Sequence, residues 1–333
     1  MEKNTNDFIL KREFSATNMP AEWKNSDAVT IHERLNSIIL RIEPSWAPTA
    51  NARLSLLKTI TAKNILILNL NNCSAYGHIY SEVLSELYAV NETYSEYDCV
   101  ITLLSSRMEN SIQFFDLKLS NRIRFIEKNQ EFLLNFEELR IVNHSPRSYV
   151  NKVKNVIALK EAFHSSKPIA KKDREFLLYC SRNSPTAKHG RRLTQETETK
   201  IIEMLEQYAN KNNLNFYLLT GQEADGTITP ISKQYDLFSN AKLVVGVHGA
   251  VMSNLIFLDP LKSSKIIEIC PTPGKCFKEL FNGAIDTFAE YHTILYKTSP
   301  KTATLEGRSF LNALGKEEST IDIHELNQLL DTI

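Results

Sequence analysis

The sequence predicts an α/β fold in which two domains are each built on a parallel sheet. The chain has 333 residues, which is ample for two domains of ordinary size. Short apolar runs alternate with amphipathic stretches of ten residues or more, the pattern of parallel strands joined by helical crossovers. A polar, lysine-rich segment containing Pro168, residues 165–175, separates two such series and marks the predicted domain boundary.

The first series predicts a domain over residues 1–168. Apolar residues recur at helical spacing from Ser81 onward and again over residues 149–163, so we expect a helix in each stretch. Short apolar runs predict three buried strands, at residues 64–70, 99–104 and 123–126.

The second series is more regular and predicts a domain over residues 169–300. Helices are expected at 193–211 and 231–241, and the first has acidic residues early and Lys211 at its end, as the helix dipole favours. A tail, residues 301–333, ends in a helix for which Asp322 and Glu325 form a capping box. The strands are expected at residues 175–181, 215–220, 242–247, 265–270 and 291–296.

The composition argues against several classes of partner. Lys plus Arg and Asp plus Glu both total 39, so no overall positive charge favours nucleic acid or an anionic membrane. The N-terminal residues lack the apolar region of a signal peptide, and no run is long enough for a transmembrane segment. Five cysteines without a C-x-x-C pair are typical of reduced structural thiols. We therefore expect a cytoplasmic protein with no metal site, for which peripheral membrane association stays open.

The stretch LVVGVHGAVMSNLIFL, residues 243–258, begins as a strand and ends as a helix, with Gly246, His248 and Gly249 at the turn. A turn that enters a helix presents unpaired backbone N–H groups and the positive end of the helix dipole, which together bind anions. The glycines let a phosphate approach the backbone, and His248 adds a side-chain donor. The alternative is a tight turn with a core histidine.

Ligands of open α/β sheets bind beyond the carboxyl ends of the strands, and four other polar residues fall at such ends. Glu268 ends a strand and is a candidate acceptor for ribose hydroxyls, or else a solvated acid. Arg182 ends the first strand of the second domain, and Arg191 and Arg192 precede a helix. Arginines bind phosphate by paired, charge-assisted hydrogen bonds, so the cluster suits a diphosphate; the alternative is a solvated basic loop.

His78 and Glu82 are the candidate general base of the first domain. They are four residues apart, so a helix places them on one face. A histidine oriented by a carboxylate titrates near neutral pH and can accept a proton from a hydroxyl. The alternative is a surface contact.

The segment LFSNAKLVVGVHGAVMSNLIFL, followed by KIIEICP, resembles the signature region of glycosyltransferase family 61. SRNSPTAKHGRRLTQETE and NCSAYGHIYSEVL resemble two upstream elements of that family, in the family's order. The final IDIHELNQLLD is similar to the tail of bacterial-type members. Gln195 stands where asparagine is usual, and Val251 with Met252 replaces a smaller, glycine-bearing pair, which bears on local packing more than on the reaction.

The resemblance implies a GT-B fold, in which two Rossmann-like domains face each other across an interdomain cleft. It also implies inverting transfer from a nucleoside diphosphate sugar, without a cofactor or an obligatory metal, to a hydroxyl of a glycan or lipid-linked saccharide. Uridine diphosphate carrying xylose or N-acetylglucosamine is the first expectation for the donor. A non-catalytic nucleotide- or glycan-binding protein and a sugar-nucleotide epimerase or hydrolase are the alternatives. The resemblance places His78 and Glu82 on the acceptor side, and it assigns donor binding to Arg182, Arg191, Arg192, Gly246, His248, Gly249, Ala250, Asn254 and Glu268.

Overall fold

The chain forms two compact units, the first made of residues 1–75, 83–113 and 118–150 and the second of residues 76–82, 114–117 and 151–333. The predicted boundary at residue 168 therefore falls one helix later than the observed change of unit near residue 150. The computed structural model describes residues 7–11, 30–34, 37–41, 58–69, 78–126, 131–143, 152–170, 172, 174–183, 192–271, 276, 278, 281, 283–297 and 318–333.

The first unit contains a five-stranded sheet in the order β1-β9-β5-β6-β7. All its pairs are parallel except that of β1 with β9, so the predicted parallel sheet is a mixed one. The three predicted strands are present as β5, β6 and β7. The bounds are β1 Asp7–Lys11, β5 Asn64–Asn69, β6 Cys99–Leu103, β7 Ile123–Ile126 and β9 Glu138–Asn143, with the helices α2 Ser85–Tyr88, α3 Val90–Thr93 and α4 Ser106–Phe114.

A second sheet of the first unit, in the order β2-β3-β8-β4, is absent from the predicted organisation. Its strands pair antiparallel except for β4 with β8. Each strand has only four or five residues, too few for a period-of-two pattern to stand out from the polar sequence around it. The bounds are β2 Thr30–Arg34, β3 Ser37–Arg41, β4 Lys58–Thr61 and β8 Glu131–Asn135.

The second unit is built on a parallel sheet in the order β12-β10-β13-β14-β15. All five predicted strands are present. Parallel strands inside such a sheet are nearly continuous apolar runs, and this makes them easy to recognise in the sequence. The chain moves from β10 to one side and then returns to the other, so the strand order reverses between β10 and β13. The bounds are β10 Phe176–Cys180, β12 Asn215–Leu219, β13 Ala241–Val247, β14 Ser264–Cys270 and β15 Ala289–Leu295.

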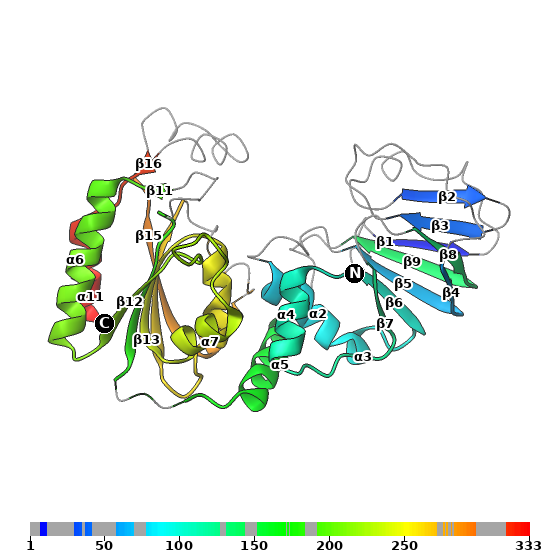
Figure 1. Cartoon of the computed structure of the whole chain (residues 1–333), viewed down its shortest axis with the longest axis horizontal. Helices are drawn as coiled ribbons and strands as arrows, with labels where there is room; N and C mark the ends of the chain where they lie inside the picture. Colours follow the sequence, from blue (N-terminus) through cyan, green and yellow to red (C-terminus); the bar gives the residue numbers. More distant parts are fainter. Residues whose placement is uncertain are drawn as a thin grey trace. The chain divides into compact units, whose positions relative to one another are not determined.

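Helices cover both faces of this sheet (Figure 1). On one face α6 (Gln195–Lys211) and the final helix α11 (Ile323–Thr332) pack together over a core that includes Tyr179, Val245 and Ile269. On the other face α7 (Ile231–Ser239) contacts β10, β13 and the 3₁₀ helix η4 (Ala250–Phe257). The Asp322 carboxylate caps α11 by accepting from the backbone N–H of His324 at 3.0 Å and of Glu325 at 3.4 Å, as the sequence predicts.

An aromatic cluster joins distant segments of the second unit. Phe163 of α5 (Lys152–Ser166) contacts Phe115 and Phe257 in tilted or edge-on geometry, and Tyr235 contacts the same two rings. Tyr80 contacts Phe163 and Phe257 at centroid distances of 5.8 and 5.0 Å. Tyr80 belongs to η3 (Ile79–Leu84), which winds as a π-helix before α2, so the predicted helix from Ser81 begins with a wider turn.

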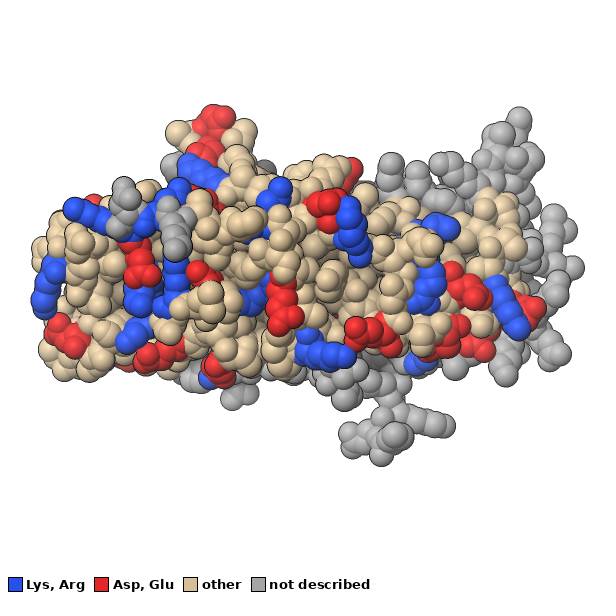
Figure 2. Space-filling model, turned by 90° about the horizontal axis from the view of Figure 1, so that it is seen from below, with Lys and Arg blue, Asp and Glu red and all other residues tan. Residues whose placement is uncertain are grey.

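The surface agrees with the neutral composition. In the view of Figure 2, basic and acidic side chains of the described residues are interspersed, without an extended area of one sign. Among the described residues, none of the helices has both the length and the apolar character needed to span a bilayer.

Candidate active site

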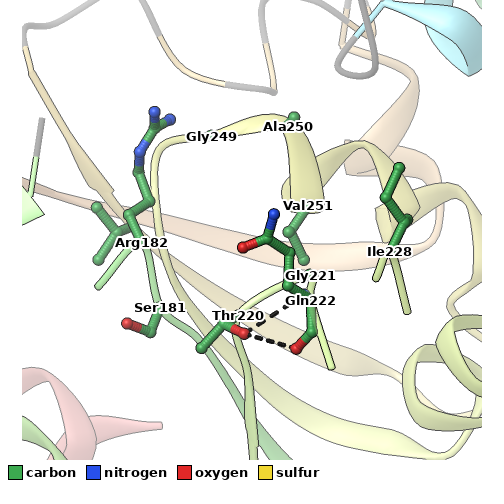
Figure 3. Close-up of a pocket in the computed structure, with 10 residues that line it drawn as sticks. Ser181, Arg182, Thr220, Gly221, Gln222, Ile228, Gly249, Ala250 and Val251 are labelled. Atoms are coloured by element: carbon green, nitrogen blue, oxygen red, sulfur yellow. Dashed lines mark hydrogen bonds between the residues drawn. The ribbon is translucent and has the colours of Figure 1, made fainter. Parts of the chain in front are cut away.

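A hollow of about 240 Å³ opens where the strand order of the second sheet reverses (Figure 3). It lies beyond the carboxyl ends of β10, β12 and β13, the place where doubly wound α/β sheets bind their ligands. Arg182, Gly249 and Ala250 of the predicted site are among its lining residues. The full lining is Ser181, Arg182, Thr220, Gly221, Gln222, Ile228, Val247, Gly249, Ala250 and Val251.

Arg182 and the turn after β13 fit directly against each other. The Nη1 of Arg182 donates to the backbone carbonyl of His248 at 2.9 Å, although 66 residues separate them in the chain. A Cβ on Gly249 would lie 2.4 Å from that Nη1. The backbone of Gly249 is extended, with φ 178°, a conformation open to any residue. Position 249 needs a glycine because the guanidinium of Arg182 occupies the space of a side chain.

The His248 ring lies on the β14 side of the turn, and His248 is not one of the residues that line the hollow. Its Nδ1 is 2.7 Å from Oε1 of Glu268, so the Nδ1–H donates to that carboxylate. The hydroxyl of Tyr291 on β15 donates to Oε2 of Glu268. Both carboxylate oxygens are thus engaged, and the hydrogen bond at Nδ1 directs Nε2 of the ring away from Glu268.

Glu268 therefore has different surroundings from those expected. It was expected at the strand end either to accept from a ribose or to face solvent, but the residue is fully buried and holds His248 and Tyr291. Glu268 and Gly246 are paired neighbours on β14 and β13, so they face the same side of the sheet. The arrangement makes Glu268 an orienting group for His248.

Val251 and Met252, two of the three residues that depart from the family pattern, pack against two glycines. A Cβ on Gly246 would lie 2.2 Å from Sδ of Met252, and a Cβ on Gly221 would lie 2.6 Å from Cγ2 of Val251. Met252 thus fills the space beside Gly246, which explains this glycine without a ligand. The element that follows Gly249 is a 3₁₀ helix, where the sequence suggests an α-helix.

Asn254 also points into the protein and not into the hollow. It is fully buried, and its Nδ2 donates to Oε1 of Gln234 at 2.6 Å. The Nε2 of Gln234 donates in turn to the carbonyl of Thr229 at 2.5 Å. This chain of hydrogen bonds connects η4, through α7, to the loop after β12 that lines the hollow.

Lys160 of α5 binds the opposite end of η4. Its Nζ donates to the carbonyl of Ile256 at 3.0 Å and to that of Leu258, and it lies 4.1 Å from the centre of the Phe288 ring. Burial lowers the pKa of Lys160 to about 7, and the charge of Asp259 partly opposes that shift. The pKa of His164, beside it, is lowered to about 4 by burial and by the charge of Lys160.

Ser181 is held by a buried carboxylate at the base of the hollow. Glu198 of α6 accepts from the hydroxyl of Tyr179 at 2.8 Å and from that of Ser181. Burial raises the pKa of Glu198, and these two hydrogen bonds oppose the rise. The network attaches the end of β10, and with it Arg182, to the start of α6.

Of the remaining predicted residues, the structure describes Arg192 and His78, and neither lines the hollow. Arg192 lies in the short strand β11 (Arg192–Leu193), which pairs with β16 (Glu318–Ser319), and Arg191 lies outside the described residues. His78 immediately precedes η3 in the second unit, and Glu82 is within η3, but its side chain lies outside what the structure describes. Their role as the base stays a prediction.

The cysteines near Glu268 are the nearest approach to a metal site. Among the described residues, Glu268, Cys270 and Cys276 bring three possible ligand atoms within 4.8 Å of one another. Glu268 already accepts from His248 and Tyr291, and the Cys270 thiol is 3.6 Å from the Glu268 carbonyl. The hydrogen bond with Cys276 and burial both raise the pKa of Cys270.

Sequence reasoning missed two groups of residues. The loop after β12, with Gly221, Gln222 and Ile228, follows a predicted strand, so the rule that ligands bind at carboxyl ends could have found it. Tyr291 could not be found in this way, because only the pairing of β14 with β15 brings it to Glu268.

The fold and the site define an α/β protein whose parallel sheet carries an arginine and an oriented histidine at the carboxyl ends of its strands. The sequence pattern of the glycosyltransferase 61 family matches residues 76–265, more than half of the chain, and the chain belongs to this family. No curated protein matches the chain.

Two solved structures similar to the chain are of one protein, TibC of enterotoxigenic E. coli H10407. The first is described as a bacterial iron-containing dodecameric glycosyltransferase; it is 10% identical, with a TM-score of 0.34. The second is described as the dodecameric iron-containing heptosyltransferase in complex with ADP-D-β-D-heptose; it is also 10% identical, with a TM-score of 0.31. Each match covers 70% of this chain and 64% of the TibC chain, so the chain spans less than two thirds of TibC's length.

Proposed function

We propose that the chain transfers a sugar, with inversion, from a nucleoside diphosphate sugar to a hydroxyl of a glycan or lipid-linked saccharide. The observation that carries this proposal is the meeting of Arg182 with the turn at His248 and Gly249, at the reversal of strand order. Uridine diphosphate carrying xylose or N-acetylglucosamine is the donor that the family resemblance favours.

The diphosphate of the donor would lie over the turn after β13. There the backbone N–H groups at the start of η4 and the guanidinium of Arg182 supply donors and positive charge. The η4 turn begins with a hydrogen bond in which Met252 N–H donates to the Gly249 carbonyl at 2.9 Å, and the N–H groups before it are the ones that a helix leaves for a ligand. His248, oriented by Glu268, would contact the donor from the β14 side.

The reaction would be a single displacement at the anomeric carbon. The acceptor oxygen forms a bond to that carbon while the bond to the phosphate oxygen breaks, and its electron pair goes to the departing nucleoside diphosphate. The acceptor's proton goes to His78 or Glu82. Arg182, His248 and the N–H groups of η4 would stabilise the charge that builds on the diphosphate, and one such preorganised donor contributes about 3 kcal/mol to the transition state.

The test follows donor and product together. The purified protein, treated with a chelator, is incubated with a panel of nucleoside diphosphate sugars, with and without saccharide acceptors. We expect diphosphate release that depends on an acceptor and a glycoside of inverted anomeric configuration. Release without any acceptor would instead identify a hydrolase or epimerase, and binding without release would identify a binding protein.

A further inference from the structure

We propose that the hollow beside Arg182 is the site for the nucleobase of the donor and that Ile228 and Val251 determine which base it accepts. This inference rests on the proposed function, because it needs a nucleotide whose phosphates lie at the turn after β13. It adds the position of the base and the residues that select it.

The described residues on the β14 side of the turn differ from those on its β12 side. On the β14 side, Glu268 is fully buried and holds both His248 and Tyr291. On the β12 side, the hollow begins at Gly249 and Ala250 and extends to the loop after β12. Within the part of the chain that the structure describes, a nucleotide with its phosphates over the turn therefore meets the hollow on the β12 side.

The lining of the hollow suits a flat ring with polar edges. Apolar surface in the hollow comes from Val247, Ala250, Val251 and Ile228. Ile228 is 61% exposed, so its side chain is accessible to a ligand. Figure 3 draws Arg182 and Ile228 on opposite sides of Val251, with Gln222 between them. An apolar wall covers the face of a base, while a few polar groups such as Gln222 can read its edge.

The loop that carries Ile228 is held in place by hydrogen bonds within the loop. Gln222 and Ile228 form a β-bridge, and Glu223 N–H donates to the Thr227 carbonyl at 2.8 Å. Asp225 Oδ1 accepts from the backbone N–H of Thr227 at 2.9 Å. A loop with a fixed conformation loses little conformational entropy when a ligand binds, and this favours higher affinity.

Val251 closes the inner end of the hollow at a position particular to this chain. Gly221 has φ +79°, and any Cβ there would be 2.6 Å from Cγ2 of Val251, so Val251 occupies the space that a side chain at position 221 would need. The family resemblance puts a smaller residue at position 251. We therefore infer that Gly221 and Val251 together determine the depth of the hollow, and with it the base that fits.

Calorimetric titration with UDP, CDP, ADP and GDP tests the inference. The proteins are the wild type, Ile228→Asp, Arg182→Ala and the control Leu261→Asp, which changes an aliphatic residue that is 90% exposed and does not line the hollow. Ile228→Ala is the second variant if the aspartate destabilises the loop. We expect the wild type to prefer one base by about tenfold or more, as apolar pockets do.

The variants should separate base from phosphate recognition. Ile228→Asp should lower the affinity for the preferred nucleoside diphosphate about tenfold, so that the four affinities become similar. Arg182→Ala should weaken all four alike and keep their ratios, and Leu261→Asp should change nothing. Equal binding of all four by the wild type, or an unchanged preference in both Ile228 variants, would overturn the base site while leaving the phosphate site standing. Failure of the wild type to bind any of them would overturn the proposed function as well.

Discussion

The Nδ1 of His248 lies 2.7 Å from Oε1 of Glu268, a carboxylate that is fully buried and also accepts from Tyr291. This pair gives the turn after β13 a histidine of defined orientation. A carboxylate that holds one ring nitrogen determines which nitrogen is presented to a ligand, so the geometry makes Glu268 a positioning residue.

Glu268→Gln should lower the rate of acceptor-dependent diphosphate release about a hundredfold, because the amide keeps the shape but removes the charge beside His248. The affinity for the donor should change much less. A matched control is Glu290→Gln, since Glu290 accepts from His292 Nε2 at 2.8 Å in an exposed pair on β15. Equal losses in the two variants would show that the buried pair has no special role.

Gly249→Ala should displace Arg182 with little effect on stability. The new Cβ would lie 2.4 Å from Nη1, and the flexible arginine can move away from it. Loss of a charge-assisted hydrogen bond to the diphosphate predicts about tenfold weaker binding. Calorimetry and thermal melting measure the two effects, and full affinity in a folded variant would place Arg182 outside the phosphate site.

Lys160 predicts a rise in stability at alkaline pH. Its pKa is about 7 in the folded protein and 10.5 as the ordinary value, so between these values the unfolded chain binds a proton that the folded chain lacks. The free energy of unfolding should therefore increase with pH, by up to about 1.4 kcal/mol per unit from this group. Urea melts between pH 7 and 9.5 should show this increment in the wild type and in the exposed control Lys200→Met, but not in Lys160→Met. Identical slopes in the wild type and Lys160→Met would contradict it.

His164 predicts a loss of stability in acid. Its pKa falls from 6.5 to about 4 on folding, so the unfolded chain binds the extra proton in this window. The stability that depends on neutral His164 is complete above pH 6.5 and is lost as the pH falls through 4. His164→Gln, which keeps a donor for the Leu258 carbonyl, should show a smaller decrease than the wild type over this range. A decrease of the same size would assign the acid sensitivity to other groups.

The sequence was most informative for the sheet of the second unit. Its inner strands β10, β13 and β14 are almost entirely buried, so they appear as apolar runs in the sequence. The cap of α11 is also visible in the sequence, because Asp322 stands three residues before Glu325. The sequence does not show which strands are neighbours. Contacts such as that of Gly246 with Glu268 therefore could not be predicted, because they depend on the order of the strands in the sheet. The antiparallel sheet of the first unit has strands too short for a detectable period.

For the site, the sequence identified the turn and Arg182 but not what each side chain faces. Asn254 and Glu268 were both expected at the ligand, and both are buried in hydrogen bonds to other side chains. Residues at strand ends are recognisable from the chain alone. The face that each presents depends on tertiary packing, as the contact of Met252 with Gly246 illustrates.

The measurement that tests the central claim most directly is calorimetric titration of the metal-free protein with the preferred nucleoside diphosphate. The wild type, Arg182→Ala and His248→Ala are compared with Lys200→Ala, which removes an exposed cation of α6. We predict that the wild type and Lys200→Ala bind alike and that the other two variants bind about tenfold or more weakly. Unchanged affinity in folded Arg182→Ala and His248→Ala would mean that the turn after β13 does not hold the diphosphate.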